Sequence, residues 1–359
     1  MNSEGMVNQT KKIELPRLVL VGPGSIEQVG DISSQLSQGK KALIVAGNQT
    51  MKIAGNTAKD FLEDSGFSVS KYIGEVANHE NVEGAQKAIN KVNADLVLGV
   101  GGGTPIDIAK LSSTREKVPF ISLPTVASHD GMGSPIASIH EKAGKGKYTS
   151  YPTTAPIAII ADTSIIKTAP YRMTASGCAD LISNYTAVED WKLAHRLKGE
   201  YYGDYSAALS IMSAEVILEN ADIIKDRLET SISLVVESLL SSGTAMCIAG
   251  TSRPCSGAEH LFSHALDRIA EKPAMHGEQC GVGTILTAYL HKLDWEKFRD
   301  ALVKIGAPVN AEELGVSDEE IVNALIMAHK IRKRYTVLGD EGLSKEAAEE
   351  LAKKTGVIK

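Results

Sequence analysis

The feature that most constrains the fold is a change of pattern near residue 165. Before it, short apolar or β-branched segments alternate with helical ones, whereas almost every segment after it has helical periodicity. Alternating strands and helices are typical of a parallel sheet covered by helices on both faces. We therefore predict an α/β domain with a doubly wound parallel sheet over residues 1–163, followed by an all-α domain over residues 164–359.

Periodicity and turn residues locate the individual elements. The expected strands of the first half are 41–47, 68–76, 94–100 and 118–125, with a helix over 80–93. A hairpin around Gly144–Gly146 should lead to one more strand that ends at Asp162. The expected helices of the second half lie near 173–196, 204–226, 230–250, 257–271 and 277–292. A capping box, Ser317 to Glu320, precedes a further apolar segment over residues 321–335.

Composition excludes several classes of protein. The net charge is −6 and no basic run is present, which argues against a nucleic-acid surface. No apolar stretch reaches the length of a membrane span, about 20 residues, and the first 15 residues lack the apolar centre of a signal peptide. We therefore expect a cytoplasmic protein. The four cysteines form no CxxC pair, so we expect reduced, mostly buried thiols.

A glycine-rich turn follows the most apolar of the expected strands. Residues 99–107 read GVGGGTPID, between a strand and a helix. Glycines at such a turn let backbone N–H groups approach a phosphate, and the helix N-terminus adds a favourable partial charge. The spacing does not match GxGxxG, and an ordinary tight turn explains the same residues equally well.

A second polar cluster follows the next strand. Residues 124–131 read PTVASHDG, in which Thr125 and Ser128 are candidates to contact a cofactor and Asp130 is a candidate to contact a substrate hydroxyl. A helix cap followed by a glycine turn is the simpler interpretation of each residue alone. Because the carboxyl ends of parallel strands meet at one edge of the sheet, two such loops favour a shared ligand.

The helical half contains a candidate metal site. Asp180, His260 and His276 belong to three separate expected helices, and His264 shares a helix face with His260. Neutral imidazole and carboxylate suit zinc or ferrous iron, and three protein ligands leave the open position of a catalytic metal. Taken singly, each residue also fits ordinary polar surface or a hydrogen-bonded core group. The histidines at 195 and 329 lie in solvated helical surroundings and receive no role.

Five motifs together resemble the iron-containing alcohol dehydrogenase superfamily, which includes glycerol dehydrogenase and 3-dehydroquinate synthase. They are GGGTPIDIAK, LPTVASHDGMGSP, SGCADLISNYTAVEDW, SGAEHLFSHALD and MHGEQCGVGT. Within the superfamily, the sequence is most similar to the sn-glycerol-1-phosphate dehydrogenases over residues 15–340. The resemblance implies a 3-dehydroquinate synthase-like fold, with a Rossmann-like N-terminal domain, a helical C-terminal domain and a site between them. In 3-dehydroquinate synthase the residue that corresponds to Asp180 is a glutamate, so aspartate at this position argues mildly against the synthase itself.

The resemblance also implies roles for particular residues. Asp180, His260 and His276 match the ligands of one divalent metal, usually Zn2+ in this subgroup. Asp130 and His264 match substrate contacts with catalytic roles, and Asp180 also matches a substrate contact. The implied contacts to NAD(H) or NADP(H) are Gly103, Thr104, Pro105, Ile106, Asp107, Thr125, Val126, Ala127, Ser128 and Ser134.

The implied reaction is the reversible reduction of dihydroxyacetone phosphate to sn-glycerol 1-phosphate, for the phospholipid backbone of archaeal membranes. The alternatives are a dehydrogenase of glycerol or another small polyol, a lyase like 3-dehydroquinate synthase, and a nucleotide-binding protein without activity. Arg253, Lys145 and Lys147 are candidates to contact the substrate phosphate, although surface exposure explains each of them as well. The resemblance also implies a homo-oligomer, and it leaves the choice between NAD and NADP open.

Overall fold

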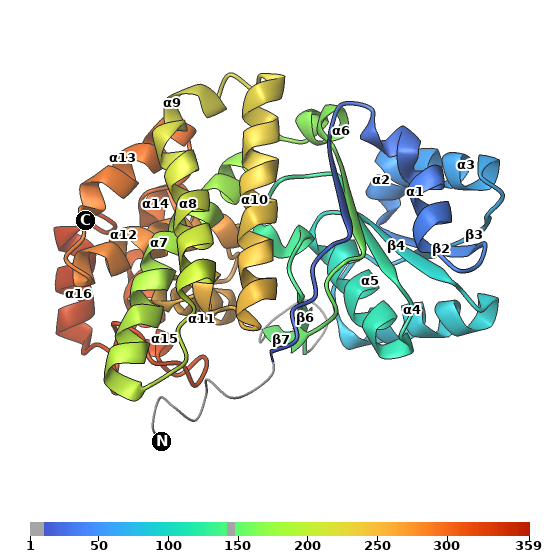
Figure 1. The fold of residues 1–359 in the computed structure, drawn as a ribbon. Coiled ribbons are helices and arrows are strands. Elements are labelled where there is room, and N and C mark those ends of the chain that lie inside the picture. The colour runs from blue at the N-terminus through green and yellow to red at the C-terminus, as the bar shows by residue number, and fades with distance from the viewer. Residues whose placement is uncertain (1–10, 142–147) are drawn as a thin grey trace. The chain divides into compact units, whose positions relative to one another are not determined.

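The computed structural model describes residues 11–141 and 148–359, which belong to two compact units (Figure 1). The α/β unit comprises residues 14–174 and 226–247. Of the described residues, the helical unit comprises 11–13, 175–225 and 248–359. The boundary expected between residues 163 and 164 stays a prediction, because compact packing and independent folding are different properties of a chain.

The α/β unit is built on a parallel sheet of six strands in the order β1-β8-β5-β4-β2-β3. These strands are β1 (Leu18–Gly22), β2 (Lys41–Ala46), β3 (Ser68–Ile73), β4 (Leu96–Gly101), β5 (Phe120–Pro124) and β8 (Ala158–Asp162). Two further strands, β6 (Ile136–His140) and β7 (Tyr148–Pro152), form a separate antiparallel pair. The turn of the predicted hairpin, with Gly144, Lys145, Gly146 and Lys147, lies outside the described residues.

Helices cover both faces of the six-stranded sheet, as Figure 1 shows. Those of the α/β unit are α1 (Val29–Leu36), α2 (Asn48–Thr50), α3 (Asn56–Asp64), α4 (His79–Val92), α5 (Gly103–Glu116), α6 (Thr163–Thr168) and α10 (Glu229–Ala249). The 3-10 turns η2 (Ser25–Gln28) and η4 (Asp130–Met132) and the π-helical turn η3 (Met51–Gly55) belong to it too. Every residue of β4 is buried, as expected for a central parallel strand. The predicted doubly wound parallel sheet is therefore confirmed.

The helical unit packs around α11 (Ala258–Ile269), which contacts both α12 (His276–Leu290) and α15 (Asp318–Ala328). Its other helices are α7 (Tyr171–Lys198), which begins in the α/β unit, α8 (Asp204–Glu219), α9 (Ala221–Ile224), η5 (Arg253–Cys255), α13 (Trp295–Ile305), α14 (Ala311–Leu314) and α16 (Lys345–Lys354). The capping box predicted at Ser317 and Glu320 begins α15. The predicted all-α second half is confirmed.

The helix α10 belongs mostly to the α/β unit although it follows α9 in the chain. Its packing is close, because a Cβ atom added at Gly243 would lie 2.8 Å from the carbonyl carbon of Gly133. Among the described residues, α10 is also the helix that is long and apolar enough to cross a membrane, yet 67% of its most apolar window is buried inside the protein. A buried core helix accounts for this composition.

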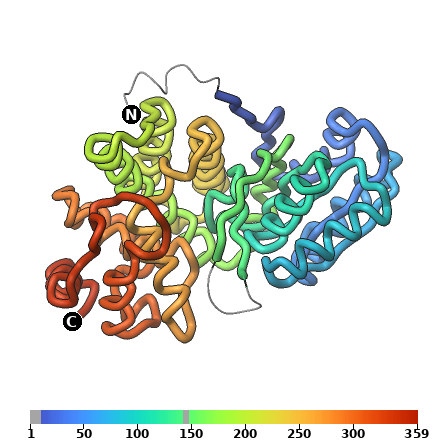
Figure 2. Tube along the Cα trace, turned by 90° about the horizontal axis from the view of Figure 1, so that it is seen from below, coloured from blue at the N-terminus to red at the C-terminus, as the bar shows by residue number. Residues whose placement is uncertain are grey.

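Several elements differ from the sequence-based expectation, and two of them are described here. The strand β1 was not predicted, and it pairs in parallel with β8, with Leu18 opposite Ala158. The helix at residues 318–328 ends at Ala328, so the remaining part of the apolar segment 321–335 is not helical. In Figure 2 this part of the chain runs as a loop before α16. Leu338 in the loop packs with Leu261 of α11, which holds the loop against the helical unit.

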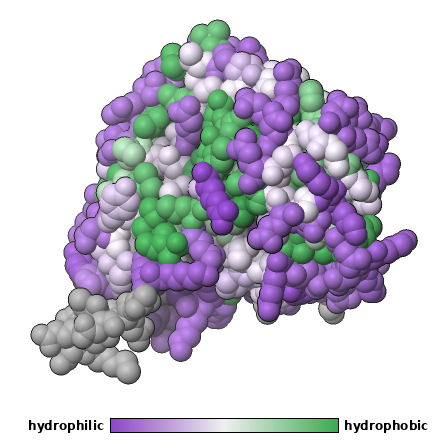
Figure 3. Space-filling view, turned by 45° about the vertical axis from the view of Figure 1, so that its right-hand side comes forward, coloured by the Kyte–Doolittle hydropathy of each residue, from purple (hydrophilic) through white to green (hydrophobic). Residues whose placement is uncertain are grey.

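The surface in Figure 3 is mostly hydrophilic, with hydrophobic side chains gathered in patches between charged ones. The four cysteines are all buried and none forms a disulfide, as predicted.

Candidate metal centre and cofactor loops

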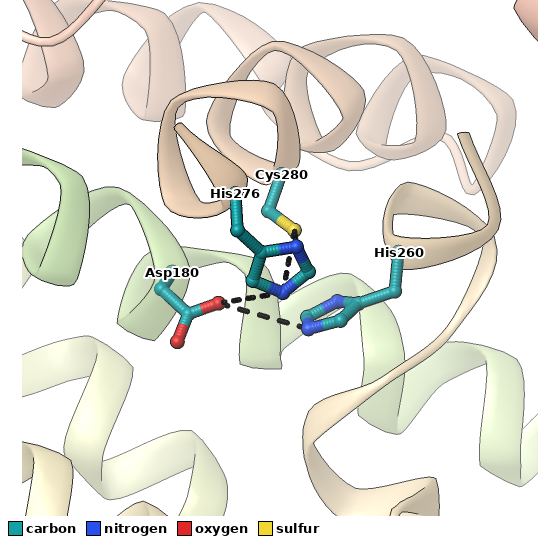
Figure 4. Close-up of side chains that lie close together, drawn as sticks. All are labelled: Asp180, His260, His276 and Cys280. Atoms are coloured by element: carbon teal, nitrogen blue, oxygen red, sulfur yellow. Dashed lines mark hydrogen bonds and ion pairs between the residues drawn. The ribbon is translucent and has the colours of Figure 1, made fainter. Parts of the chain in front are cut away.

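Three helices bring a group of metal-ligating side chains together in the helical unit. Asp180 on α7, His260 on α11, and His276 and Cys280 on α12 place their ligand atoms within 4.8 Å of one another, and Figure 4 shows them converging. Asp180 Oδ1 lies 3.6 Å from His260 Nε2 and 3.7 Å from His276 Nε2. Bonds of 2.0–2.2 Å to a tetrahedral zinc would place ligand atoms about 3.3–3.6 Å apart. The donor set and its spacing therefore fit one divalent metal.

Neighbouring side chains hold each imidazole ring by the nitrogen that faces away from Asp180. His260 Nδ1 lies 3.0 Å from Glu259 Oε1, and His276 Nδ1 lies 3.1 Å from Ser263 Oγ. Such partners select the tautomer and the ring orientation of a metal-binding histidine. Both Nε2 atoms are thus directed toward the carboxylate of Asp180.

Glu259 is fully buried and anchors this arrangement. Its carboxylate accepts hydrogen bonds from Gly257 N at 2.5 Å and from Thr186 Oγ1 at 3.2 Å, in addition to its contact with His260. Burial alone would raise the pKa of Glu259. The hydrogen bond with His260, the charge of His260 and hydrogen bonds from the backbone act in the opposite direction, and the pKa is lowered overall. The side chain is therefore an acceptor-only carboxylate at neutral pH.

Ser263 connects His276 to a second polar network. Its hydroxyl donates to Gln279 Oε1 at 2.8 Å, and Gln279 Nε2 donates to Asp267 Oδ1 and to the carbonyl of Ala274. The side-chain oxygen and nitrogen of Gln279 thus both have hydrogen-bond partners, so no polar atom of this side chain is left unsatisfied. We did not predict Glu259, Ser263 or Gln279, although all three lie within the motifs that carry the resemblance.

Cys280 is the ligand-type side chain that the sequence reasoning missed. Its Sγ lies 3.6 Å from His276 Nε2, because residues four apart share one face of a helix. Burial raises the pKa of the Cys280 thiol well above its ordinary value. The spacing of His276 and Cys280 was the available signal, but we had interpreted all four cysteines only as buried thiols.

His264 lies beside the ligand group. Its ring stacks on that of His276 with the centroids 5.6 Å apart, and its Nδ1 lies 3.7 Å from Asp267 Oδ2. Burial lowers the pKa of His264, although Asp267 acts in the opposite direction. The imidazole is consequently neutral at pH 7 and is available to take up a proton.

In the α/β unit, the two predicted loops follow neighbouring strands. Gly101 at the end of β4 is paired with Pro124 at the end of β5, and Thr125 N donates to the carbonyl of Gly101 at 3.0 Å. Gly101 has a φ of +145°, a conformation that favours glycine. A Cβ atom added at Gly103 would lie 2.5 Å from His129 Nε2, so glycine at this position lets the two loops meet.

The predicted cofactor contacts differ in exposure. Gly103, Thr104, Val126 and Ser128 are partly exposed, and α5 begins at Gly103, so N–H groups of its first turn are not used within the helix. Pro105, Ile106, Asp107, Thr125, Ala127 and Ser134 are buried. Among these, Thr125 Oγ1 has no hydrogen-bond partner, which fits a polar ligand at this edge.

A buried lysine ties these loops together. Lys110 is completely buried, and its ammonium donates to the carbonyls of Gly131 at 2.6 Å and Ile136 at 2.7 Å. It also lies 3.4 Å from Asp107 Oδ1, while Asp107 Oδ2 accepts a hydrogen bond from Ser138 N. The side chain of Asp107 thus bonds within the unit. Asp130 Oδ2 accepts a hydrogen bond from Ser242 Oγ of α10 at 2.7 Å.

Arg253, the described candidate for the substrate phosphate, bonds within the helical unit. Its Nε and Nη2 atoms donate to Glu200 at 2.9 and 2.5 Å, and its Nη1 donates to the carbonyl of Tyr335 at 2.8 Å. Because the N–H groups of Arg253 bond other residues of the protein, Arg253 is better suited to position those residues than to bind the substrate phosphate. The other two candidates, Lys145 and Lys147, lie outside the described residues.

Comparisons with known proteins agree with this architecture. The family described as iron-containing alcohol dehydrogenase matches residues 20–170. Solved structures of a glycerol dehydrogenase from Schizosaccharomyces pombe and a probable glycerol dehydrogenase from Sinorhizobium meliloti share the fold. Their TM-scores are 0.80 and 0.78 and their identities 22% and 18%, with 97% of this chain and 91% and 98% of theirs covered.

Curated relatives are much closer in sequence. Glycerol-1-phosphate dehydrogenase (NAD(P)+) of Methanosarcina acetivorans is 54% identical over 98% of both chains. The proteins of the same name from Methanothermobacter thermautotrophicus and Thermococcus sibiricus are 54% and 53% identical, over 97% and 96% of this chain and 99% and 98% of theirs. The chain therefore belongs to the iron-containing alcohol dehydrogenase family and, within it, to the glycerol-1-phosphate dehydrogenases.

Proposed function

We propose that this protein is an NAD(P)-dependent oxidoreductase that interconverts dihydroxyacetone phosphate and sn-glycerol 1-phosphate. The observation that carries the proposal is the identity of 51–54% over nearly the whole chain to relatives named for glycerol 1-phosphate. The convergence of Asp180, His260 and His276 supports it, because a reaction at a carbonyl needs a group that stabilises developing negative charge on oxygen.

The metal proposed for this site is Zn2+, held by Asp180, His260 and His276. When bound, it would polarise the substrate carbonyl as a Lewis acid, which is worth several kcal/mol. Glu259 and Ser263 keep both imidazoles in the required tautomer. In this proposal Cys280 is a neighbour of the three ligands and is not itself a ligand, which keeps the open position that a catalytic metal requires.

The chain's own residues would handle the proton and the cofactor. We propose that His264 passes a proton to or from the substrate oxygen through a water molecule, since its neutral imidazole suits general acid–base chemistry. Asp130 is proposed to bind a substrate hydroxyl. The loops after β4 and β5 are proposed to bind NAD(H) or NADP(H), which supplies the hydride.

The remaining parts of the proposal concern the cell. The product would supply the glycerol backbone of archaeal phospholipids, and the enzyme would act in the cytoplasm as a homo-oligomer. A native mass measurement tests the last point directly, because a single mass near 38.2 kDa would contradict it.

The decisive experiment follows NADH and NADPH absorbance with dihydroxyacetone phosphate, before and after removal of metal by a chelator and again after zinc is restored. Consumption that is lost with the metal and regained with zinc is the expected result, and comparing the two cofactors shows which is preferred. With metal bound but no consumption, the proposal would fail, and glycerol and then cyclising substrates would be tested next.

A further inference from the structure

A second buried carboxyl group lies on the helix that carries Asp180. Asp190 of α7 has no exposed surface. Steps of three, four and three residues lead from Asp180 through positions 183 and 187 to Asp190, so both side chains lie on one face of the helix. At 1.5 Å per residue, Asp190 is about 15 Å further along α7. No step of the proposed reaction uses it, so its burial needs another explanation.

Each oxygen of Asp190 meets a group on another element of the helical unit. Oδ2 accepts a hydrogen bond at 2.7 Å from the backbone N–H of Ala258, the first residue of α11. Oδ1 lies 3.0 Å from Nε2 of His291, the C-cap residue of α12. Oδ1 also accepts a hydrogen bond at 2.6 Å from Val337 N in the loop after α15. One side chain of α7 therefore joins α11 and α12, and these three helices carry the metal ligands.

The beginning of α11 is shaped to receive this carboxyl group. Its N-cap residue is Gly257, which has no side chain to accept a hydrogen bond from the first turn. A Cβ atom added at Gly257 would lie 2.6 Å from Asp190 Oδ2 and 2.9 Å from the Cα atom of Ala187. Glycine at this position therefore lets α7 approach closely, and Asp190 supplies the missing acceptor from another helix.

The contact at Ala258 leads directly to a metal ligand. The next residue is Glu259, whose Oε1 lies 3.0 Å from Nδ1 of the following residue, His260. The backbone that Asp190 holds is thus the backbone from which both side chains project. A shift of this turn would change the distance of 3.6 Å between His260 Nε2 and Asp180 Oδ1. Metal–ligand distances tolerate errors of only about 0.2 Å.

The surroundings make these contacts hard to replace. Ala258 belongs to an apolar cluster with Leu261 and Leu338, and Val337 packs against it. Asp190 and Ala258 are both fully buried, so water cannot substitute for a hydrogen bond that is lost between them. Loss of the carboxyl group is therefore relieved by movement of the helix ends.

We propose that Asp190 is a positioning residue of the metal site, which sets α11 against α7 and α12 so that His260 faces Asp180. It touches neither the metal nor the substrate. The inference rests on the metal of the proposed function, but it requires neither a particular substrate nor a particular nicotinamide cofactor. Metal binding without substrate is therefore the property to measure.

The experiment replaces Asp190 by asparagine and measures zinc affinity by competition with a chelator. Asparagine has one acceptor oxygen in place of two, so either the N–H of Ala258 or that of Val337 loses its partner. We expect the dissociation constant for zinc to rise at least about 10-fold in the folded protein. Cobalt(II) bound in place of zinc should show a changed visible absorption, because that spectrum depends on coordination geometry.

Leu314→Ala is the matched control, because it removes a buried side chain from α14, a helix of the same unit that carries no ligand. It should lower the midpoint of urea unfolding and leave zinc affinity and the cobalt spectrum unchanged. Equal loss of zinc affinity in both variants would overturn the proposal, and so would unchanged affinity in folded Asp190→Asn. No zinc binding by the unmodified protein would refute the proposed metal itself, and this role of Asp190 with it.

Two further variants decide the question if Asp190→Asn does not fold. Gly257→Ala keeps the carboxyl group but displaces it from Ala258 N, and should also weaken zinc binding about 10-fold. His291→Leu leaves the bond to Ala258 in place, so its effect should be smaller than that of Gly257→Ala. The reverse order, or no effect of either substitution, would contradict a route from Asp190 through α11 to His260.

Discussion

The cofactor loops of the α/β unit and the metal ligands of the helical unit are built in opposite ways. The loops are two continuous stretches of chain at the ends of β4 and β5, and glycine backbone shapes them. The ligands are single side chains from α7, α11 and α12. The first kind of site forms where two adjacent strands of one sheet end, whereas the second exists only when side chains from three separate helices meet.

The two sites also differ in what stabilises them. In the loops, one buried cation, Lys110, joins segments by donating to backbone carbonyls. Around the ligands, side chains hold side chains, as Glu259 holds His260 and Ser263 holds His276. Damage to the first site should therefore appear as lost stability of the α/β unit, and damage to the second as lost metal.

The largest effect should come from removing a metal ligand. Asp180→Asn or His260→Ala is expected to lose bound metal and to lower activity by at least roughly 10³-fold, because Lewis-acid stabilisation of several kcal/mol disappears. Elemental analysis and the NADPH assay measure the two properties together. Asp222→Asn, an exposed carboxylate of the same unit, should change neither. Full activity in a metal-free Asp180→Asn protein would refute the ligand assignment.

The next largest effect should come from Lys110 in the α/β unit. Lys110→Met leaves the carboxylate of Asp107 and two carbonyls without their buried partner. The expected loss is about 3–5 kcal/mol of unfolding free energy, measured by urea denaturation, while bound zinc stays stoichiometric in the folded protein. Lys91→Met at the exposed end of α4 is the control. Loss of zinc without loss of stability would break the contrast between the two sites.

A smaller effect should follow from changing a residue that supports a ligand. Glu259→Gln keeps the size of the side chain but removes the charge beside His260. We expect zinc affinity, measured by competition with a chelator, to fall about 10- to 100-fold, with the metal still bound at high concentration. Glu278→Gln is a useful comparison, because that carboxylate is also buried in the same unit but caps the backbone at Met275. Equal effects of the two substitutions would mean that general packing, not orientation of His260, explains the loss.

The smallest effect should appear at the capping box of α15, which depends on neither site. The backbone N–H of Ser317 lowers the pKa of Glu320 below its ordinary value of 4.5, so its contribution is present above that pH and lost as the pH falls through the lowered value. Glu320→Gln should cost about 0.5–1 kcal/mol at pH 7. In urea denaturation, the difference from the unmodified protein should shrink toward pH 3. A difference that grows on acidification would contradict the assigned sign.

The cofactor loops could be predicted from the sequence more directly than the metal ligands. The parallel sheet and the strand-end loops could be predicted because β4 is apolar throughout and the glycine turn follows it directly. Residue type and placement made Asp180, His260 and His276 candidates, and a resemblance identified them as the ligands, since spacing alone relates His260 only to His264. Cys280 shows the limit, because its place beside His276 was visible as helical spacing but its role as a neighbour of Asp180 depends on packing.

The loop after α15 could not be predicted, for a physical reason. The apolar pattern of residues 321–335 continues past Ala328, but tertiary hydrogen bonds replace helical ones there. Arg253 binds the carbonyl of Tyr335, and Arg334 binds the carbonyl of Ser256. Such long-range partners cannot be seen in local periodicity, which is why residues 321–335 were interpreted as one continuous apolar segment and Arg253 was selected alone.

The position of α10 has a consequence for how the protein is made. On a ribosome, the sheet and its helices emerge before residue 226, but the helix that supplies Ser242 to Asp130 and packs on Gly133 is synthesised later. The α/β unit therefore cannot complete its packing until α7 to α9 of the other unit have been synthesised, and until then the surface that α10 covers stays exposed. A chain that ended before residue 226 would lack α10. The nascent protein can reach its final structure only after most of its length has been translated.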